Sequence, residues 1–197
     1  CSPVRKGNGR MKRQVVLYLG MSLDGYLADL HGGVDWMVGE NPGDLGDLGY
    51  AQFLQQVDTI LMGGTTYRQV TEELSPGEWP YPGLHCHVFT HREAVNQEGI
   101  TFHCGDAGEV VRELLARPGK DIWVCGGADL AGQLLQKGLI DRFQISILPV
   151  LLGGGIPLFQ GGFSTIPLAL AETKAENGIV ELTYLRRGNA PQTKPME

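Results

Sequence analysis

Apolar residues in this chain fall into short runs that are separated by glycine-rich turns. The length of these runs and their content of Val, Ile and Leu are typical of buried strands rather than of helices. The pattern predicts strands at Gln14–Ser22, Asp58–Gly63, His85–Thr90, Ile100–His103, Asp121–Cys125 and Arg142–Leu148. Two more strands, Leu168–Glu176 and Ile179–Arg186, flank the dipeptide Asn177-Gly178, which is a strong signal for a hairpin.

Between the strands, apolar positions recur with the spacing of a helix. The sequence predicts an amphipathic helix over Asp44–Val57 and a helix that starts within Gly64–Thr71. A third helix begins after the capping residue Asp106, and a fourth covers Ala128–Lys137. Strands that alternate with helices and end in a hairpin predict an α/β sandwich around a mostly parallel sheet with an antiparallel edge.

Length and composition set the expected domain organisation. The chain has 197 residues, of which 42% are apolar, and this is enough for one folded domain with a hydrophobic core. We expect that domain to cover residues 12–187. Residues 1–11 are expected to be a disordered extension or a remnant of expression. The polar residues 188–197, which include prolines, are expected to be a disordered tail.

Charge and hydropathy exclude two classes of partner. The formal net charge is −6, and because the first 13 residues hold five basic side chains and no acid, the remaining body carries about −11. Such a surface repels the phosphate backbone of nucleic acids. No apolar run approaches the roughly 18 residues that span a bilayer, and Cys1–Arg10 lacks the apolar region of a secretory signal. We therefore expect a cytoplasmic protein that binds neither nucleic acid nor membranes.

Cysteine and histidine do not form a recognisable metal site. The four cysteines make no Cys-x-x-Cys pair and have no ligand spacing with histidine, and Cys125 lies in an apolar run as a buried thiol would. His85 and His87 alternate on a predicted strand without a third ligand. The sequence also lacks the signatures of serine hydrolases and zinc deaminases. We expect reduced thiols and no metal cofactor.

Two junctions between a strand and a helix carry the most chemical information. Leu61–Tyr67 and Trp123–Leu130 each leave an apolar strand, turn through Gly-Gly and open a helix. Free backbone N–H groups at a helix start favour an anion, and Thr65 and Thr66 add hydroxyl donors. Because the carboxyl ends of parallel strands share one edge, a ligand with two phosphate groups could bridge both junctions. The alternative is that Gly-Gly only makes tight turns.

Short motifs follow one another through residues 12–187. They are Met21–Tyr26, Val34–Trp36, Leu61–Gly63 with Thr66-Tyr67, Gly77–Tyr81, Asp121–Trp123 with Gly126-Gly127, Gly138–Asp141, and Pro149–Gly153 with Pro157–Phe159. In this order they resemble the dihydrofolate reductase-like superfamily. Within it, the chain is similar to the reductase domain at the C-terminus of the bacterial bifunctional riboflavin-biosynthesis enzyme. The resemblance implies the three-layer α/β sandwich of that superfamily.

The resemblance further implies an NADPH-dependent reductase. The cofactor-binding residues would be Gly63, Gly64, Thr65, Thr66, Thr90, His91, Arg92, Gly126, Gly127, Ala128, Asp129 and Leu130. The family usually has a basic residue after the glycine of the first junction, where it reaches the 2′-phosphate, whereas this chain has Gly64. Because an Arg–phosphate pair is a strong contact, Arg92, His91 or Arg68 would have to replace it, and NADH stays an alternative cofactor.

On the substrate side, the resemblance points to two carboxylates and two aromatic rings. Asp24 would stand at the mouth of the nicotinamide pocket, and Asp47 falls where dihydrofolate reductases keep the acid that binds the pterin. Both are candidate catalytic residues that would manage a proton, with an ordered water as the alternative. Asp-Gly is also an ordinary turn, and an aspartate at a helix start is an ordinary cap. Trp36 and Tyr50 would stack on a flat heterocycle or else belong to the core.

The reaction implied by this resemblance is hydride transfer to a C=N or C=O group of a small heterocycle. The activity most similar to it is the 5-amino-6-(5-phosphoribosylamino)uracil reductase step of riboflavin biosynthesis. One alternative is dihydrofolate reductase activity. Another is a nucleotide-binding module of the same fold that has lost catalysis, for which Gly64 is the best support. The resemblance also implies a homodimer.

Overall fold

The computed structural model describes residues 12–44 and 46–188, so the predictions of disorder for residues 1–11 and 189–197 lie outside the described residues. The strands are β1 (Val15–Ser22), β2 (Tyr26–Ala28), β3 (Val57–Gly63), β4 (His85–Phe89), β5 (Ile100–His103), β6 (Asp121–Gly126), β7 (Arg142–Leu148), β8 (Ile156–Pro157), β9 (Leu168–Glu176) and β10 (Ile179–Arg186). The helices are α1 (Tyr50–Gln56), α2 (Gly64–Arg68), the π-helix η1 (Gln69–Leu74), α3 (Ala107–Leu115) and α4 (Ala128–Gln136).

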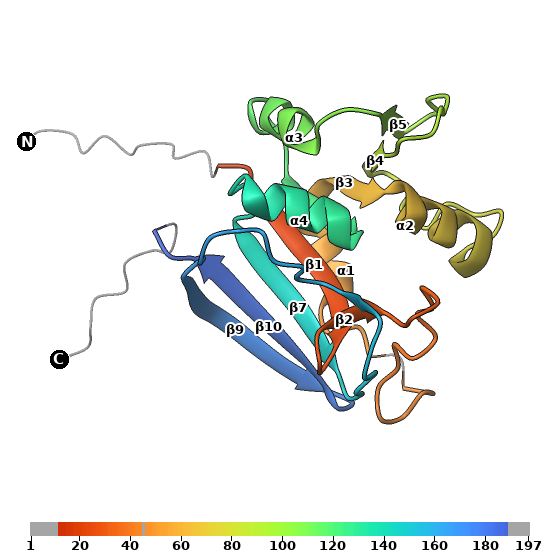
Figure 1. Cartoon of the computed structure of the whole chain (residues 1–197), viewed down its shortest axis with the longest axis vertical. Coiled ribbons are helices and arrows are strands. Elements are labelled where there is room, and N and C mark those ends of the chain that lie inside the picture. Colours follow the sequence, from red (N-terminus) through yellow and green to blue (C-terminus); the bar gives the residue numbers. More distant parts are fainter. Residues whose placement is uncertain (1–11, 45, 189–197) are drawn as a thin grey trace, which may run out of the picture.

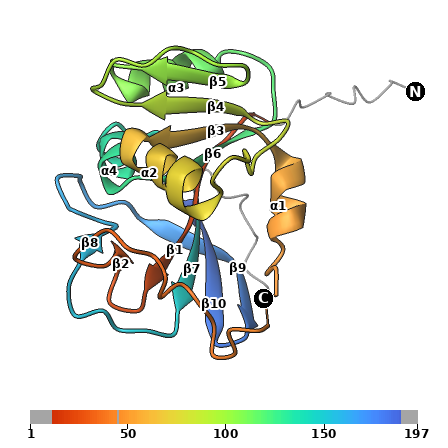
Figure 2. The ribbon, with the colours of Figure 1, turned by 90° about the vertical axis from the view of Figure 1, so that its right-hand side faces the viewer.

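An eight-stranded sheet in the order β5-β4-β3-β6-β1-β7-β10-β9 runs through the protein (Figures 1 and 2). All neighbours from β5 to β7 are parallel, while β10 pairs antiparallel with β7 and β9. The predicted mostly parallel sheet with an antiparallel C-terminal hairpin is therefore confirmed. Since β1 lies between β6 and β7 and is covered on both faces, its continuous apolar run is what a central parallel strand requires.

Helices cover the parallel part of the sheet from both sides (Figure 2). On one face, α3 and α4 bury their apolar stripes, including Val111 and Leu134, against Leu17 of β1. On the other face, Phe53 of α1 packs among Tyr18 and Trp123. The three-layer sandwich that the resemblance implied is confirmed.

Two helix predictions need correction. The helix expected over Asp44–Val57 begins only at Tyr50, because Leu48 and Gly49 have φ angles of 48° and 87°, which a right-handed helix excludes. The helix expected from Gly64 changes into a π-helix after Arg68, and Ser75 N donates to Val70 O. The small sheet of β2 and β8 was not predicted, since strands this short leave no periodic pattern.

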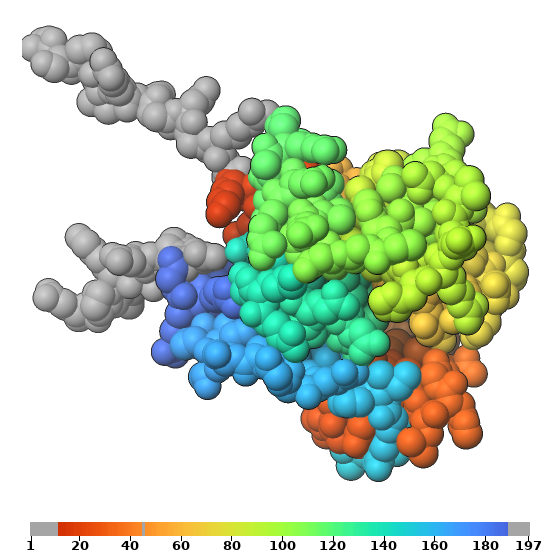
Figure 3. Space-filling model, turned by 45° about the horizontal axis from the view of Figure 1, so that its top comes forward, coloured from red at the N-terminus to blue at the C-terminus, as the bar shows by residue number. Residues whose placement is uncertain are grey.

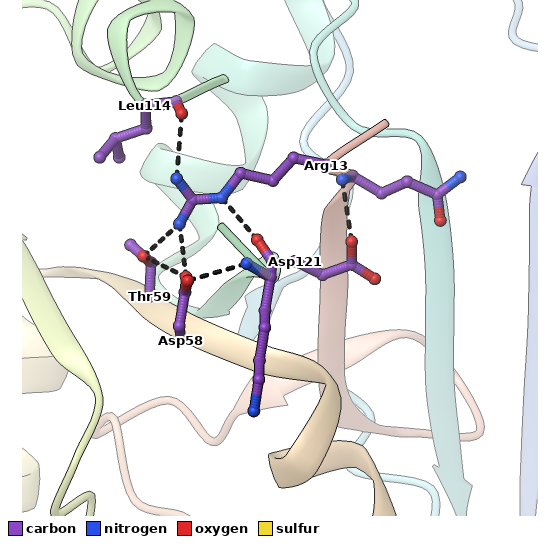
Figure 4. Close-up of polar contacts among 7 residues, drawn as sticks. Arg13, Asp58, Thr59, Leu114 and Asp121 are labelled. Carbon is purple, nitrogen blue, oxygen red and sulfur yellow. Dashed lines mark hydrogen bonds and ion pairs between the residues drawn. The ribbon is translucent and has the colours of Figure 1, made fainter. Parts of the chain in front are cut away.

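The amino ends of β1, β3 and β6 are joined by the side chain of Arg13 (Figure 4). Its guanidinium pairs with Asp58 and donates to Thr59 Oγ1, to Lys120 O and, at 3.0 Å, to Leu114 O. The Arg13 side chain is 7% exposed, so this is a buried cation that makes four hydrogen bonds, one from Nε, one from Nη1 and two from Nη2. The network ties the start of three neighbouring strands to the end of α3.

Within the described ranges, each helix is too short or too polar to cross a bilayer.

Candidate functional site

A cleft of about 840 Å³ opens along the carboxyl ends of the parallel strands. Gly63, Thr90 and Gly126 lie where β3, β4 and β6 end, and Val34 and Met37 border the opposite side. Figure 3 shows the surface hollowed between the teal α4 and the orange segment that follows β2. Open α/β sheets bind ligands at this edge, so the cleft is the candidate site on position as well as on size.

The two glycine junctions meet at one end of this cleft. A Cβ on Gly127 would lie 3.5 Å from Gly63 N and 3.6 Å from Gly63 Cα, and a Cβ on Gly126 would lie 3.3 Å from Thr66 Cγ2. Gly127 also has φ of 99°, which L side chains rarely adopt. Gly127 is therefore required by its backbone conformation, while a side chain at Gly126 would meet Thr66 more tightly than an ordinary van der Waals contact allows.

Helix α4 presents unused donors to the cleft. Its first internal hydrogen bond runs from Ala131 N to Gly127 O, so the N–H groups of Ala128, Asp129 and Leu130 precede the helical ladder, and no side chain caps them. All three residues line the cleft. Backbone N–H groups and the helix dipole favour an anion at such a position.

Gly64 has a steric explanation. A Cβ at this position would lie 3.0 Å from both Cβ and Oγ1 of Thr90, so a larger residue fits only if the Thr90 side chain moves by a few tenths of an ångström. Thr90 therefore disfavours the basic residue that the resemblance leads us to expect at position 64. Arg68 and Arg92 line the same end of the cleft, and neither guanidinium has an ion pair within the described residues.

His91 and His103 also border this end. His103 accepts or donates one hydrogen bond with His87 Nδ1 at 2.8 Å and stacks on Phe89. Burial lowers the pKa of His103, so the imidazole is neutral at pH 7. The permanent positive charges at this end of the cleft come from Arg68 and Arg92.

The other end of the cleft has an aromatic wall with a polar floor. Tyr18, Tyr50 and Trp123 line it, and the Tyr50 ring lies 6.2 Å from Tyr18 and 6.1 Å from Trp123, between ring centroids. Ser146 of β7 lines the same region. Burial raises the pKa of Tyr50, so the phenol stays neutral. A flat ring with polar edges matches these surfaces.

The predicted cofactor-binding residues all line this one cleft, and so does Tyr50. Asp24, Asp47 and Trp36 do not line it. The catalytic role of the two aspartates and the stacking role of Trp36 stay predictions.

Asp24 forms local structure at the end of β1. Its carboxylate accepts from Ser22 Oγ at 2.6 Å, Gly153 N at 2.8 Å and Leu152 N at 3.1 Å. The Ser22 hydrogen bond is the main cause that lowers the pKa of Asp24, with the two backbone donors adding to it. The Asp24 carboxylate therefore joins the turn after β1 to the loop that contains Gly153.

Asp47 and Trp36 are likewise held by nearby backbone. Asp47 accepts from Gly49 N at 2.7 Å and from Ala51 N at 3.3 Å, which caps the start of α1. Trp36 Nε1 donates to Gly33 O at 3.0 Å.

Tyr18 and Ser146 were not singled out from the sequence. A signal was present for Tyr18, which is a polar residue inside an apolar run, whereas Ser146 lies in a strand that alternates polar and apolar residues. Such a residue needs a partner, and that partner is supplied by a strand that is distant in sequence.

The cysteines of the core are poor nucleophiles. Burial raises the pKa of Cys86 and of Cys125 to about 12, so both stay neutral thiols at pH 7. Among the described residues, no three His, Cys, Asp or Glu side chains come together as a metal site would require.

The model of the RibD C-terminal domain family matches residues 13–183. The uncharacterized protein YwjB of Bacillus subtilis (strain 168) is 39% identical over 177 residues, which cover 89% of this chain and 99% of the relative. The uncharacterized protein YyaP of the same strain is 32% identical over 187 residues, which cover 90% and 97%.

Solved structures share the fold. A putative riboflavin biosynthesis protein from Shewanella sp. PV-4 is similar with a TM-score of 0.77 and 26% identity over 88% of this chain and 99% of that one. The diaminohydroxyphosphoribosylaminopyrimidine deaminase/5-amino-6-(5-phosphoribosylamino)uracil reductase of Thermotoga maritima has a TM-score of 0.65 at 16% identity. That match covers 89% of this chain but 57% of the Thermotoga chain, and at this identity it concerns the fold alone.

Proposed function

This chain belongs to the RibD C-terminal domain family, and on that premise we propose that it is a reductase that uses NADPH to reduce a C=N or C=O group of a small heterocycle. The observation that carries the proposal is that one cleft has both glycine junctions at one end and an aromatic wall at the other. A pyrimidine of the riboflavin pathway is the first substrate to consider, since the Thermotoga protein of the same fold is named for reducing one.

The residues at the glycine end fit a dinucleotide. The N–H groups at the start of α4, with the hydroxyls of Thr65 and Thr66, are donors suited to a pyrophosphate. Gly63 and Gly127 have no side chains that would keep a phosphate group away from the backbone at either junction. Arg68, Arg92 or His91 would take the 2′-phosphate in place of a basic residue at position 64.

The cofactor and the protein would have different roles in the proposed reaction. When bound, NADPH supplies the hydride, and the protein orients the two rings and keeps water away from them. Tyr50 and Trp123 provide a flat wall on which the substrate heterocycle can stack. We propose an ordered water as the proton source, because the carboxylates of Asp24 and Asp47 are occupied by hydrogen bonds to nearby backbone N–H groups.

Titration with NADPH and NADH, followed by nicotinamide fluorescence, tests the proposal. We expect micromolar binding of NADPH, weaker binding of NADH, and consumption of NADPH with an aminouracil substrate. If NADH binds as tightly, the reductase stands and the cofactor changes. If NADPH binds without turnover of any heterocycle, the protein is a nucleotide-binding module of the same fold. If neither binds, the proposal is wrong.

Two alanine variants in one helix region provide a matched control. Gly127→Ala forces a side chain into a left-handed position beside Gly63, and we expect NADPH affinity to fall at least tenfold. Gly132→Ala lies in α4 with no atom within 4 Å of the new Cβ, and we expect unchanged affinity. Equal affinities for the two variants would contradict the proposed phosphate site.

We also propose the homodimer that the resemblance implies. Strand β9 is at one edge of the sheet, with Leu170 57% exposed, and an unpaired edge favours association. Light scattering coupled to gel filtration measures the mass directly, and a monomer at micromolar concentration would contradict this expectation.

A further inference from the structure

Three histidines lie together on one face of β4 and β5, at the edge of the sheet (Figure 2). The ring centroids of His85 and His87 are 4.7 Å apart, and those of His87 and His103 are 5.1 Å apart. His85 Nε2 shares a hydrogen bond with Thr101 Oγ1 at 2.9 Å, and His87 Nδ1 shares one with His103 Nε2 at 2.8 Å. The imidazoles therefore form a row that reaches the cleft at His103.

Backbone hydrogen bonds hold His103 beside the loop that contains Arg92. Thr90 N donates to His103 O at 2.9 Å, and Arg92 N donates to Thr90 Oγ1 at 3.1 Å. The thiol of Cys104, which follows His103 in the chain, donates to Arg92 O at 3.9 Å. His103 and Arg92 both line the cleft. The His103 imidazole is therefore placed at the end of the cleft where the proposed 2′-phosphate would lie.

One ring nitrogen of His103 is left for a ligand. Within the described residues, Nε2 is used by His87, and no hydrogen bond reaches Nδ1. Two neutral imidazoles share a single proton in such a contact, and either ring can be its donor. In a protonated His103 both nitrogens carry a proton, so Nε2 donates to His87 and Nδ1 donates to the ligand. The contact with His87 is therefore compatible with a charged His103 as well as with a neutral one.

Neighbouring charges act on the His103 imidazole in both directions. Burial is the main cause that lowers the pKa of His103, and the charge of His85 lowers it further, whereas the Glu113 carboxylate of α3 raises it. A phosphate dianion at this end of the cleft would add to the effect of Glu113, because a nearby negative charge favours the imidazolium. The remaining titratable groups at this end and on the adjoining loop are Arg68, His91, Arg92, Asp129 and the pair of Asp106 with Lys137.

His87 stays a neutral acceptor in this pair. Burial is the main cause that lowers the pKa of His87 to about 4, and the neighbouring histidines and the positive charges of Arg13 and Arg117 contribute. His87 is therefore uncharged between pH 6.5 and pH 8. A proton that the pair takes up in this range resides on His103, the ring that lines the cleft.

We propose that His103 is a specificity residue that takes up a proton from solvent when a 2′-phosphate binds, so that the preference for NADPH over NADH increases as the pH falls from 8 toward 6.5. This inference rests on the proposed function, because it concerns the regulation of the same cofactor site. A phosphate monoester keeps its second negative charge above a pH of about 6, so the imidazole sets the pH range. Arg68 and Arg92 would supply the attraction that does not depend on pH.

Two nucleotides that differ only in the 2′-phosphate test this coupling. Adenosine 2′,5′-bisphosphate carries that group, and adenosine 5′-monophosphate lacks it. Isothermal titration of each into the protein at pH 7, in two buffers of different ionisation enthalpy, gives the number of protons taken up on binding. We expect the wild-type protein to take up about half a proton more with the bisphosphate. We also expect its affinity relative to the monophosphate to increase about threefold from pH 8 to pH 6.5.

His103→Gln keeps a side chain that forms hydrogen bonds but cannot be charged. We expect this variant to lose the extra proton uptake and the change of relative affinity with pH. A purely structural role of His103 would weaken both nucleotides and leave the extra uptake unchanged. His31→Gln is the matched control, because His31 is exposed and does not line the cleft. We expect this control to keep the wild-type uptake.

The outcomes separate this inference from the proposed function. Should His103→Gln fail to fold, His91→Gln decides, because it removes the other histidine that lines the cleft and should keep the extra uptake. Loss of the uptake in His91→Gln would overturn the role of His103, and so would a wild-type protein that takes up no extra proton or binds both nucleotides equally. Extra uptake at His103 without oxidation of NADPH by any heterocycle would uphold His103 and overturn the reductase. Oxidation of NADPH without extra uptake would do the reverse.

Discussion

The two ends of the parallel sheet use polar groups in opposite ways. At the amino ends, side chains take up backbone groups, since Arg13 donates to two carbonyls and Asp121 accepts from Gln14 N at 2.9 Å (Figure 4). At the carboxyl ends, α2 and α4 begin at Gly63 and Gly127 without a side-chain cap. An end whose polar groups are satisfied internally serves stability, and an end whose donors are left open serves a ligand.

The largest effect is expected at the amino ends of the strands, where the polar groups are satisfied within the protein. Arg13→Ala removes the cation that pairs with Asp58 and leaves Leu114 O and Lys120 O without this donor, and we expect a loss of about 3 kcal/mol in the free energy of unfolding. Urea denaturation measures this loss, and NADPH affinity of the folded variant should stay within about twofold. Arg117→Ala is the control, because its pair with Glu113 is exposed and contributes less than about 0.5 kcal/mol. Equal losses in the two variants would contradict the anchoring role of Arg13.

The next largest effect concerns the positive charges beside the cleft, at the carboxyl ends of the strands. Arg92→Ala and Arg68→Ala each remove a cation that borders the cleft, and we expect the variant that lacks the 2′-phosphate partner to bind NADPH about tenfold more weakly. Its affinity for NADH should hardly change, because NADH lacks that phosphate. Fluorescence titration of both cofactors gives the answer, with the exposed Arg112→Ala of α3 as the control. Equal losses for NADPH and NADH would show a general effect on the fold.

A smaller effect sharpens the explanation of Gly64. Gly64→Ala places a Cβ 3.0 Å from Thr90, and we expect it to cost about 1 kcal/mol in the free energy of unfolding. In the double variant Gly64→Ala/Thr90→Gly the contact is absent, so the two costs should be less than additive. Gly43→Ala, which meets no atom within 4 Å, is the control for the substitution itself. Strict additivity in the cycle would rule out the contact with Thr90.

The smallest effect is expected at the histidine pair His87 and His103, of which His103 lines the cleft. Burial lowers the pKa of His87 from 6.5 to about 4, so the unfolded chain takes up this proton more readily than the folded one. The contribution of His87 to stability is therefore complete above pH 6.5 and is lost as the pH falls toward 4.

Replacing His87 tests the predicted direction in which stability changes with pH. We expect His87→Gln to flatten the decline in urea midpoint between pH 6.5 and pH 4, whereas the exposed His31→Gln should leave the decline as in the wild type. A steeper decline in His87→Gln would contradict the prediction that protonation of His87 destabilises the fold at low pH.

Local pattern was enough for much of the fold. The hairpin at Asn177-Gly178 and the capped start of α3, where Asp106 accepts from Gly108 N at 2.6 Å, follow from residues that are neighbours in sequence. The glycine junctions were found in the same way, because a strand, a turn and a helix start occur within a few residues.

The parts that escaped prediction depend on distant partners. Arg13 counted as one of several basic residues at the start of the chain, because nothing near it in sequence indicates that Asp58 and Leu114 surround it. His103 looks like an ordinary position of a short strand until β4 is placed beside it. Asp24 was identified by sequence, yet its backbone partners at Leu152 and Gly153 come from a loop far along the chain.

The central position of β1 also has a consequence for how the chain reaches this fold. Strand β1 comes first among the described strands, but its hydrogen-bonded neighbours are β6 and β7, and the contact of Gln14 with Asp121 spans 107 residues. Until Asp121–Gly126 has been synthesised, the apolar β1 has neither neighbour, and it gains the second only with Arg142–Leu148. Folding dominated by such distant pairings is slow, and until it is complete it exposes hydrophobic surface that is prone to aggregation. The nascent chain is therefore expected to depend on chaperones more than a helical bundle of equal length would.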